Sequence, residues 1–384
     1  MQRRARFWTV AAVVIGGLIL TPLGLMALRW ASQPNAAFEM PYRGYSVECM
    51  RFSPDGRNLA VVTNENGFGG AKEIQRTRVY RVPDGTIVHE IENGARMCAW
   101  NSNGSILAVA SLNGEEFDLW DTQTWVRKNR LSVGFSEYDK RARALISTHD
   151  LSLCFDRQGS LYAAVDPATD AGGDVNPFAR AKVWWNASYG KGQIKVEQLG
   201  TCQTPFDLST GFLGTDTRVA ISGISEQPLV EILRVRKGPS GNGIVQRDYE
   251  LTDLGPPESE FVWPAIRLTA DGKYLVVRTM ERCRLYRLFD DHAKLLRSRE
   301  DKIDSKAMRR SIGCVLDVSL DGRFAAYSST DRAEVIRIPD GESVFEVRQA
   351  PSPIALSPDG RLLAVADREQ KSIRFYQVPQ GAEK

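Results

Sequence analysis

Histidine is scarce in this 384-residue sequence, which contains only His89, His149 and His292. Imidazole is the side chain most often used for acid-base chemistry and for binding transition metals. HExxH, G-x-S-x-G and phosphate-loop motifs are also missing, and these motifs mark zinc peptidases, serine hydrolases and many nucleotide-binding enzymes. The sequence therefore predicts no catalytic residue, no cofactor and no resident metal ion.

A strong charge of either sign is missing as well. Lys and Arg number 50 against 47 Asp and Glu, which leaves a formal net charge of +3. Nucleic-acid binding relies on a clustered positive field, which this balance does not supply. We therefore expect no nucleic-acid partner, and the 42% apolar and 25% charged residues are typical of a folded soluble domain.

The six cysteines include no C-x-x-C pair. Four of them fall on predicted first strands of different repeats: Cys49, Cys98, Cys154 and Cys314. Buried free cysteine behaves as a small apolar residue, so we interpret these four as structural thiols. If a disulfide forms, Cys202 and Cys283 are its expected partners, and the redox state stays open at this stage.

A long uncharged run covers residues 7–28. A helix of this length would span about 33 Å, enough for a hydrocarbon core of roughly 30 Å. The run predicts a single transmembrane helix after a basic cytoplasmic end, residues 1–6, with a linker at 29–35. Arg3, Arg4 and Arg6 precede the run, which places the N-terminus in the cytoplasm and residues 36–384 outside it, in the periplasm or extracellular space. A cleaved signal peptide and a twin-arginine export signal are the alternatives.

Beyond residue 35 a turn motif recurs between short apolar runs. SPDG occurs at residues 53–56 and 357–360, and related turns are NSNG, DRQG, GTDT, TADG and SLDG, with glycines at 104, 159, 214, 272 and 322. Asp-Gly and Asn-Gly favour tight hairpins because these residues tolerate positive φ. The runs on either side, such as VECMRF and LAVVT, therefore predict antiparallel strand pairs.

Each unit continues with a third and a fourth strand, as in TRVYRV and TIVHEI, joined by PDG at residues 83–85. Repeated units of four strands predict an all-β fold, a seven-bladed β-propeller of four-stranded antiparallel blades preceded by the transmembrane helix. The last unit stops after its third strand, at residues 372–378. We expect residues 36–40 to supply the missing strand, closing the ring.

Three stretches, FSPDGRNLAVVT, RVYRVPDGTIV and FDLWDTQTW with its Trp120-Asp121 pair, resemble WD-repeat and YVTN-type β-propellers. The resemblance covers residues 36–380 and implies the propeller fold. The Gly-His pair usual in WD repeats is missing, and Trp-Asp ends only one third strand. The resemblance therefore implies no particular ligand.

Most long connections fall on the side of the disc that carries the second-to-third strand loops and the blade-to-blade loops. Loops on a rigid scaffold often bind partners, and Arg and aromatic residues supply most interface hot spots. We therefore predict a protein-binding surface at six loop residues: Arg141, Arg143, Phe261, Trp263, Arg309 and Arg310.

Two groups of carboxylates are alternative candidate sites. Asp166, Asp170 and Asp174 recur every four residues in a Gly-rich loop, but they lack the spacing and closing Glu of an EF-hand. Another set lies on predicted first strands, near the expected central channel: Glu48, Asp207 and Asp317.

The main hypothesis is a membrane-anchored, non-catalytic platform or scaffold that binds another protein. One alternative is a propeller-type enzyme with a site at the central channel, either a metal-assisted hydrolase or lactonase or a quinoprotein-like dehydrogenase. A second is a ligand sensor or structural subunit of an envelope complex. Fold alone cannot choose among them, because one fold hosts many functions.

Overall fold

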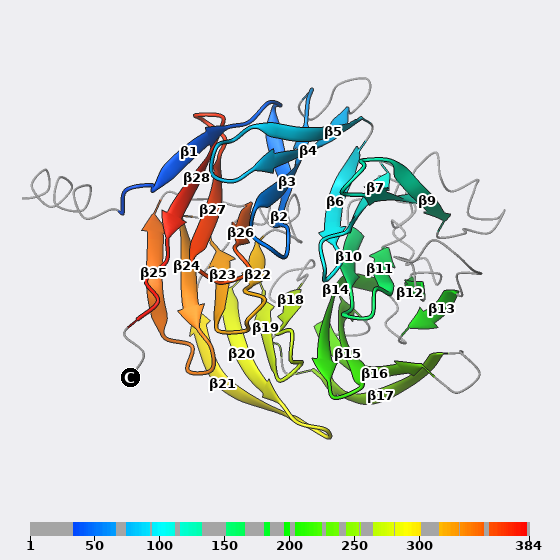
Figure 1. The fold of residues 1–384 in the computed structure, drawn as a ribbon. Helices are drawn as coiled ribbons and strands as arrows, with labels where there is room; N and C mark the ends of the chain where they lie inside the picture. Colours follow the sequence, from blue (N-terminus) through cyan, green and yellow to red (C-terminus); the bar gives the residue numbers. More distant parts are fainter. Residues whose placement is uncertain are drawn as a thin grey trace, which may run out of the picture. The chain divides into compact units, whose positions relative to one another are not determined.

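The computed structural model describes residues 34–66, 74–92, 94–111, 116–132, 151–165, 180–184, 196–199, 204–224, 228–237, 243–252, 254, 264–279, 281–300, 315–329, 331–348 and 353–381. Every regular element among these residues is a β-strand. The strands form four-stranded antiparallel sheets, each of which is one blade of a β-propeller (Figure 1).

Six blades are built from four strands that are consecutive in the chain. Blades 1 and 2 contain β2 (Ser46–Phe52), β3 (Asn58–Asn64), β4 (Gln75–Arg81) and β5 (Ile87–Glu92), then β6 (Gly94–Trp100), β7 (Ile106–Ser111), β8 (Glu116–Asp121) and β9 (Arg127–Ser132). Blades 3 and 4 contain β10 (Leu151–Phe155), β11 (Leu161–Val165), β12 (Arg180–Trp184) and β13 (Val196–Leu199), then β14 (Thr204–Leu213), β15 (Asp216–Ile224), β16 (Pro228–Lys237) and β17 (Gly243–Leu251).

Blades 5 and 6 contain β18 (Ala265–Leu268), β19 (Tyr274–Arg278), β20 (Arg282–Leu288) and β21 (Ala293–Glu300), then β22 (Leu316–Val318), β23 (Phe324–Ser328), β24 (Arg332–Arg337) and β25 (Ser343–Arg348). Blade 7 is composite. It combines β1 (Phe38–Pro41) from the start of the described chain with β26 (Ile354–Leu356), β27 (Leu362–Asp367) and β28 (Ser372–Gln377) from its end.

The inner strands close a circle. β2, β6, β10, β14, β18, β22 and β26 each contact the next in chain order, and β26 contacts β2. A blade therefore packs on both of its faces, which explains why the second strands are nearly continuous apolar runs. Side chains on both sides of β3 and β27 are buried, whereas most side chains of the outermost strand β21 are exposed.

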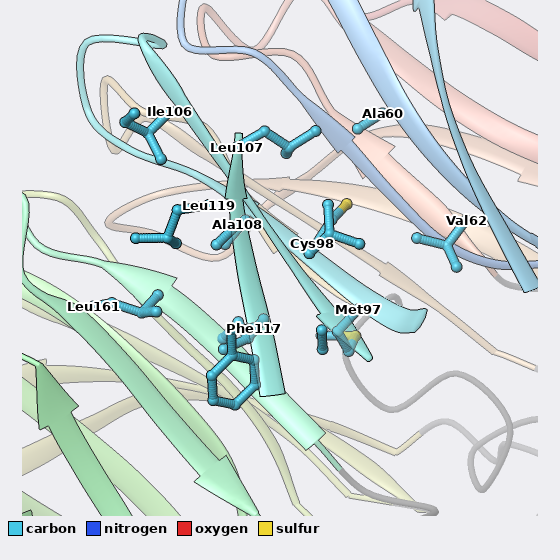
Figure 2. Packing of buried hydrophobic residues seen from close by; sticks show 14 of the residues in the cluster. Ala60, Val62, Met97, Cys98, Ile106, Leu107, Ala108, Phe117, Leu119 and Leu161 are labelled. Carbon is cyan, nitrogen blue, oxygen red and sulfur yellow. The ribbon is translucent and has the colours of Figure 1, made fainter. Parts of the chain in front are cut away.

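The recurring turn motif forms the hairpin between the first and second strand of each blade. All seven turn glycines have a positive φ, for example 71° at Gly56 and 68° at Gly360. Glycine adopts this conformation without strain, so the motif ends one strand and starts the next. The core lies between blades, where Val62 of blade 1 faces Met97 and Cys98 of blade 2 (Figure 2).

The composite blade joins the two ends of the described chain. β1 pairs antiparallel with β28, from Phe38 opposite Phe375 to Pro41 opposite Ser372. This is the pairing expected between residues 36–40 and 372–378, although β1 begins at Phe38. The rings of Phe38 and Phe375 stack with centroids 4.3 Å apart, and Met40 is buried beside them.

The fold class expected from the sequence needs a correction. It was a seven-bladed propeller preceded by a transmembrane helix, whereas the structure shows an all-β propeller with six contiguous blades and one composite blade. Among the described residues, no helix is long and apolar enough to cross a membrane. The run at residues 7–28 lies outside the described residues.

Candidate functional site

The six predicted partner-binding residues cannot be placed. Arg141, Arg143, Phe261, Trp263, Arg309 and Arg310 all lie outside the described residues. The same holds for His149, for the three aspartates of the Gly-rich loop, and for Cys202 and Cys314.

Both described histidines lie away from the inner strands. His89 is on the outer strand β5, where its ring stacks on Trp125 at 4.7 Å and lies 5.7 Å from Trp120. Burial lowers the pKa of His89 below its usual value. His292 lies in the turn before β21 and stacks on Phe289. Aromatic packing thus accounts for both rings.

Asp207 is a link between three inner strands. The side chain is fully buried on β14, and its Oδ1 accepts hydrogen bonds from Ser152 Oγ of β10 at 2.6 Å and from Leu208 N at 2.9 Å. Its Oδ2 accepts from Ile266 N at 2.9 Å and from Arg267 Nη1 at 2.8 Å, both on β18. Four donors satisfy this carboxylate, and they tie blades 3, 4 and 5 together.

Asp317 makes a similar link on the other half of the ring. Its Oδ1 accepts from Val318 N at 3.1 Å, and its Oδ2 accepts from Leu356 N of β26 at 2.9 Å. Arg51 of β2 places its Nη1 3.8 Å from Oδ1, so three blades again meet at one carboxylate. Glu48, the third candidate, accepts a hydrogen bond from Ser46 Oγ at 2.6 Å and is also buried.

These contacts give the inner-strand carboxylates a structural role. A general acid or base must reach a substrate proton, whereas both oxygens of Asp207 and of Asp317 already bind donors of the fold. Within the described ranges, no group of three or more His, Cys, Asp or Glu side chains could hold a metal ion.

Four cysteines fall in the described part of the chain, and all are free thiols: Cys49, Cys98, Cys154 and Cys283. The first three lie on inner strands, as predicted, and Cys283 is on β20. Burial raises the pKa of Cys154 to about 12. A thiol with this pKa is a poor nucleophile at neutral pH, which fits a packing role.

The two ends of the blades differ in how their polar groups are used. We call the end with the first-to-second and third-to-fourth turns the turn face, and the opposite end the loop face. Ser53, Thr269, Ser319 and Ser357 each donate to the Asp two residues later, over 2.6 to 2.7 Å. The turn face is thus built from repeated, internally satisfied hairpins.

The loop face exposes an aromatic and apolar surface where blade 7 meets blade 1. Tyr45 and Ile74 are 42% and 37% exposed, and the Arg368 guanidinium lies 4.6 Å from the centre of the Tyr45 ring. Tyr45 N donates to Asn64 O, and Glu65 N donates to Ile74 O. The hydrogen-bonded sheet of blade 1 therefore extends by one residue beyond these ends of β2, β3 and β4. We call Tyr45, Ile74 and Arg368 the Tyr45 patch.

A buried arginine, Arg78, binds chain segments that lie next to this patch. Arg78 is nearly inaccessible and donates to Glu65 Oε1 at 2.9 Å and to Glu90 Oε2 at 2.7 Å. It also donates to the backbone oxygen of Arg43, two residues before Tyr45, at 2.9 Å. Hydrogen bonds to the two carboxylates help to raise the pKa of Arg78 against the opposing effect of burial. The hydrogen bond from Arg78 to the Arg43 carbonyl thus holds the backbone directly before Tyr45.

Sequence reasoning missed the Tyr45 patch. Tyr45 and Arg368 are 323 positions apart (368 minus 45), and they meet only because the composite blade brings the chain ends together. The one sequence signal was an aromatic residue two positions before the predicted strand at residues 47–52.

Comparisons with protein-family models and with curated proteins found no match for this chain. The resemblance to WD-repeat proteins therefore extends no further than the pattern of strands and turns. Taken together, the sheets, the inner ring and the repeated turns identify the chain as a β-propeller of four-stranded antiparallel blades.

Proposed function

We propose that this protein is a non-catalytic platform that binds another protein through the loop face, at the Tyr45 patch. The observation that carries the proposal is the exposed Tyr45 ring with the Arg368 guanidinium 4.6 Å from its centre, together with the exposed Ile74 at the same end of blade 1. Tyr and Arg are enriched among the residues that dominate binding energy at protein interfaces. A β-propeller is compatible with such a role, because its rigid blades present fixed surfaces at both ends.

The rigidity of the patch favours binding. Ordering a flexible side chain at an interface costs about 0.5–1.5 kcal/mol, so groups that are already held lose less on binding. Arg368 stacks on Tyr45, and the bonds of Arg78 to Glu65 and to the Arg43 carbonyl hold the underlying backbone. The patch thus combines an apolar centre with a fixed cation.

The inner-strand carboxylates support a non-catalytic role. Asp207 and Asp317 link neighbouring blades through their own hydrogen bonds. Among the described residues, no observation favours the hydrolase, the dehydrogenase or the sensor. An extracytoplasmic location stays a prediction, because it depends on residues outside the described ranges.

Site-specific photo-crosslinking in cells of the native host tests the proposal. A photo-reactive phenylalanine analogue would replace Tyr45 on the loop face or, as a control, Leu320 on the turn face, which is 51% exposed. We expect a discrete adduct from position 45 and none from position 320. Arg368→Ala should weaken the adduct from position 45. Equal adducts from both faces, or an unchanged adduct in the Arg368→Ala variant, would contradict the proposal.

A further inference from the structure

Three fully buried side chains at the loop-face end of blade 1 carry polar atoms without a hydrogen-bond partner. They are Asn64, Gln75 and Thr77, with 0%, 1% and 0% of their surfaces exposed. The atoms concerned are Asn64 Nδ2, Gln75 Oε1 and Thr77 Oγ1. Asn64 Oδ1 accepts from Asn66 N at 3.1 Å, which fixes the orientation of the Asn64 amide. The set therefore offers one donor, one acceptor and one hydroxyl.

The three side chains lie on the same side of the blade. Asn64 is directly opposite Gln75, and Val62 is directly opposite Thr77. Directly paired residues and residues two apart along a strand share a face of the sheet. Val62 belongs to the apolar layer between blades 1 and 2, across from Met97 and Cys98 (Figure 2). The polar atoms thus continue this layer toward the loop face.

The position of Thr77 is apolar in the equivalent place of other blades. Thr77 is paired with the residue six positions after the turn glycine, Gly56. The residues with the same pairing in blades 2, 5, 6 and 7 are Phe117, Cys283, Ala333 and Ile373, all buried. Blade 1 thus has a hydroxyl where these four blades bury an apolar side chain.

Leaving such atoms unpaired is costly. A buried donor or acceptor without a partner destabilises the fold, and most buried polar side chains in folded proteins are satisfied. The turn-face hydroxyls of the same repeats follow this rule, since Ser53, Ser319 and Ser357 donate to aspartates. A partner from outside the chain would satisfy the three unpaired atoms of blade 1.

We propose that Asn64, Gln75 and Thr77 form a binding site for one internal water molecule between blades 1 and 2. Water accepts a hydrogen bond from Asn64 Nδ2 and donates one to Gln75 Oε1, while the Thr77 hydroxyl can complete the set as donor or acceptor. Buried waters typically make about three hydrogen bonds to otherwise unsatisfied polar groups. The site lies one row inside Tyr45 and Ile74, but the inference does not depend on the proposed partner binding.

Two substitutions at position 77 separate the hydroxyl from the methyl group. Thr77→Val keeps the shape but removes the hydroxyl, whereas Thr77→Ser keeps the hydroxyl and loses only the methyl. With a bound water, Thr77→Val removes one of its hydrogen bonds, and we expect its Tm to fall by about 2 °C. Without one, replacing an unsatisfied hydroxyl by a methyl group leaves the Tm unchanged or raises it.

The decisive measurement is a high-resolution crystal structure of the wild-type protein and of the Thr77→Ser variant. We expect a water within hydrogen-bond distance of Asn64 Nδ2 and Gln75 Oε1 in both. No water at this place, or a Thr77→Val variant that is as stable as the wild type, would overturn the inference. Gln75→Met serves as the second variant if Thr77→Val does not fold, and it should also lower the Tm.

Discussion

At the residue scale, single buried polar side chains connect neighbouring blades. Asp207 accepts hydrogen bonds from Ser152 of blade 3 and from Ile266 and Arg267 of blade 5, while it belongs to blade 4 itself. Asp317 reaches Leu356 of blade 7 in the same way. In a ring of sheets held mainly by apolar packing, such a carboxylate adds directional bonds between blades.

Asp207→Asn should destabilise the protein strongly. In the variant an amide NH2 group replaces one carboxylate oxygen, and this group can only donate hydrogen bonds, so it cannot pair with the donors around it. The negative charge beside Arg267 is also lost. Removing one partner of a buried charge pair costs about 3–5 kcal/mol. Urea denaturation followed by circular dichroism measures this difference. Asp291→Asn, at an exposed turn residue beside His292, is the control and should leave the stability nearly unchanged.

His89 should make stability depend on pH. Burial lowers its pKa in the folded state, whereas the unfolded chain has a histidine pKa of about 6.5. Between these two values the unfolded state binds more protons, so stability rises with pH. The contribution is present above about pH 6.5 and is lost as the pH falls through the lower folded pKa.

His89→Gln isolates this contribution. The free energy of unfolding of the wild type, minus that of the variant, should decrease when the pH is lowered from about 7 to 5. Denaturant unfolding of both proteins at several pH values gives this difference. A difference that stays constant or grows on acidification would show that the pKa of His89 is not lowered by its place beside Trp125.

At the element scale, β1 closes blade 7 as its outer strand. With four residues each, β1 and β13 are the shortest outer strands in the described part of the chain. The four residues of β1 pair with β28, and two of them supply most of its packing. Phe38 stacks on Phe375, and Met40 lies against Gly85 in a turn of blade 1. β1 therefore joins blade 7 both to the end of the described chain and to the neighbouring blade.

Met40→Ala should loosen this closure. Truncation of a buried Met costs about 2–5 kcal/mol, because the contacts of the side chain are lost and a cavity remains. We expect faster hydrogen exchange in β28, measured by mass spectrometry, together with lower overall stability. Glu39→Ala is a control on the same strand, where the side chain is exposed and pairs only distantly with Arg374. Equal effects of both variants would contradict a closure held by Met40.

At the scale of the whole molecule, the ring brings distant parts of the chain together. Tyr45 precedes the first strand of blade 1, and Arg368 follows the second strand of blade 7. Their contact exists because β26 lies next to β2 and β1 pairs with β28. The proposed binding surface is thus a consequence of ring closure rather than of any local motif.

The strand and turn pattern could be predicted from the sequence for a clear reason. Hairpins are local, and each depends on a glycine with positive φ between two apolar runs, as at Gly56 and Gly360. The pairing of the chain ends followed from counting strands per unit. The run at residues 7–28 lies outside the described residues, and among the described ones no helix is long and apolar enough to cross a membrane.

The sequence by itself determined the repeat, the four strands of each unit and the strand that completes the last one, because apolar runs and turn residues act over short distances. Only the tertiary structure decided what individual polar residues do. Asp207 is satisfied by backbone N–H and guanidinium groups of another blade, and Tyr45 is covered by an arginine more than three hundred residues away. Such contacts depend on how blades pack around the ring, which no local pattern encodes.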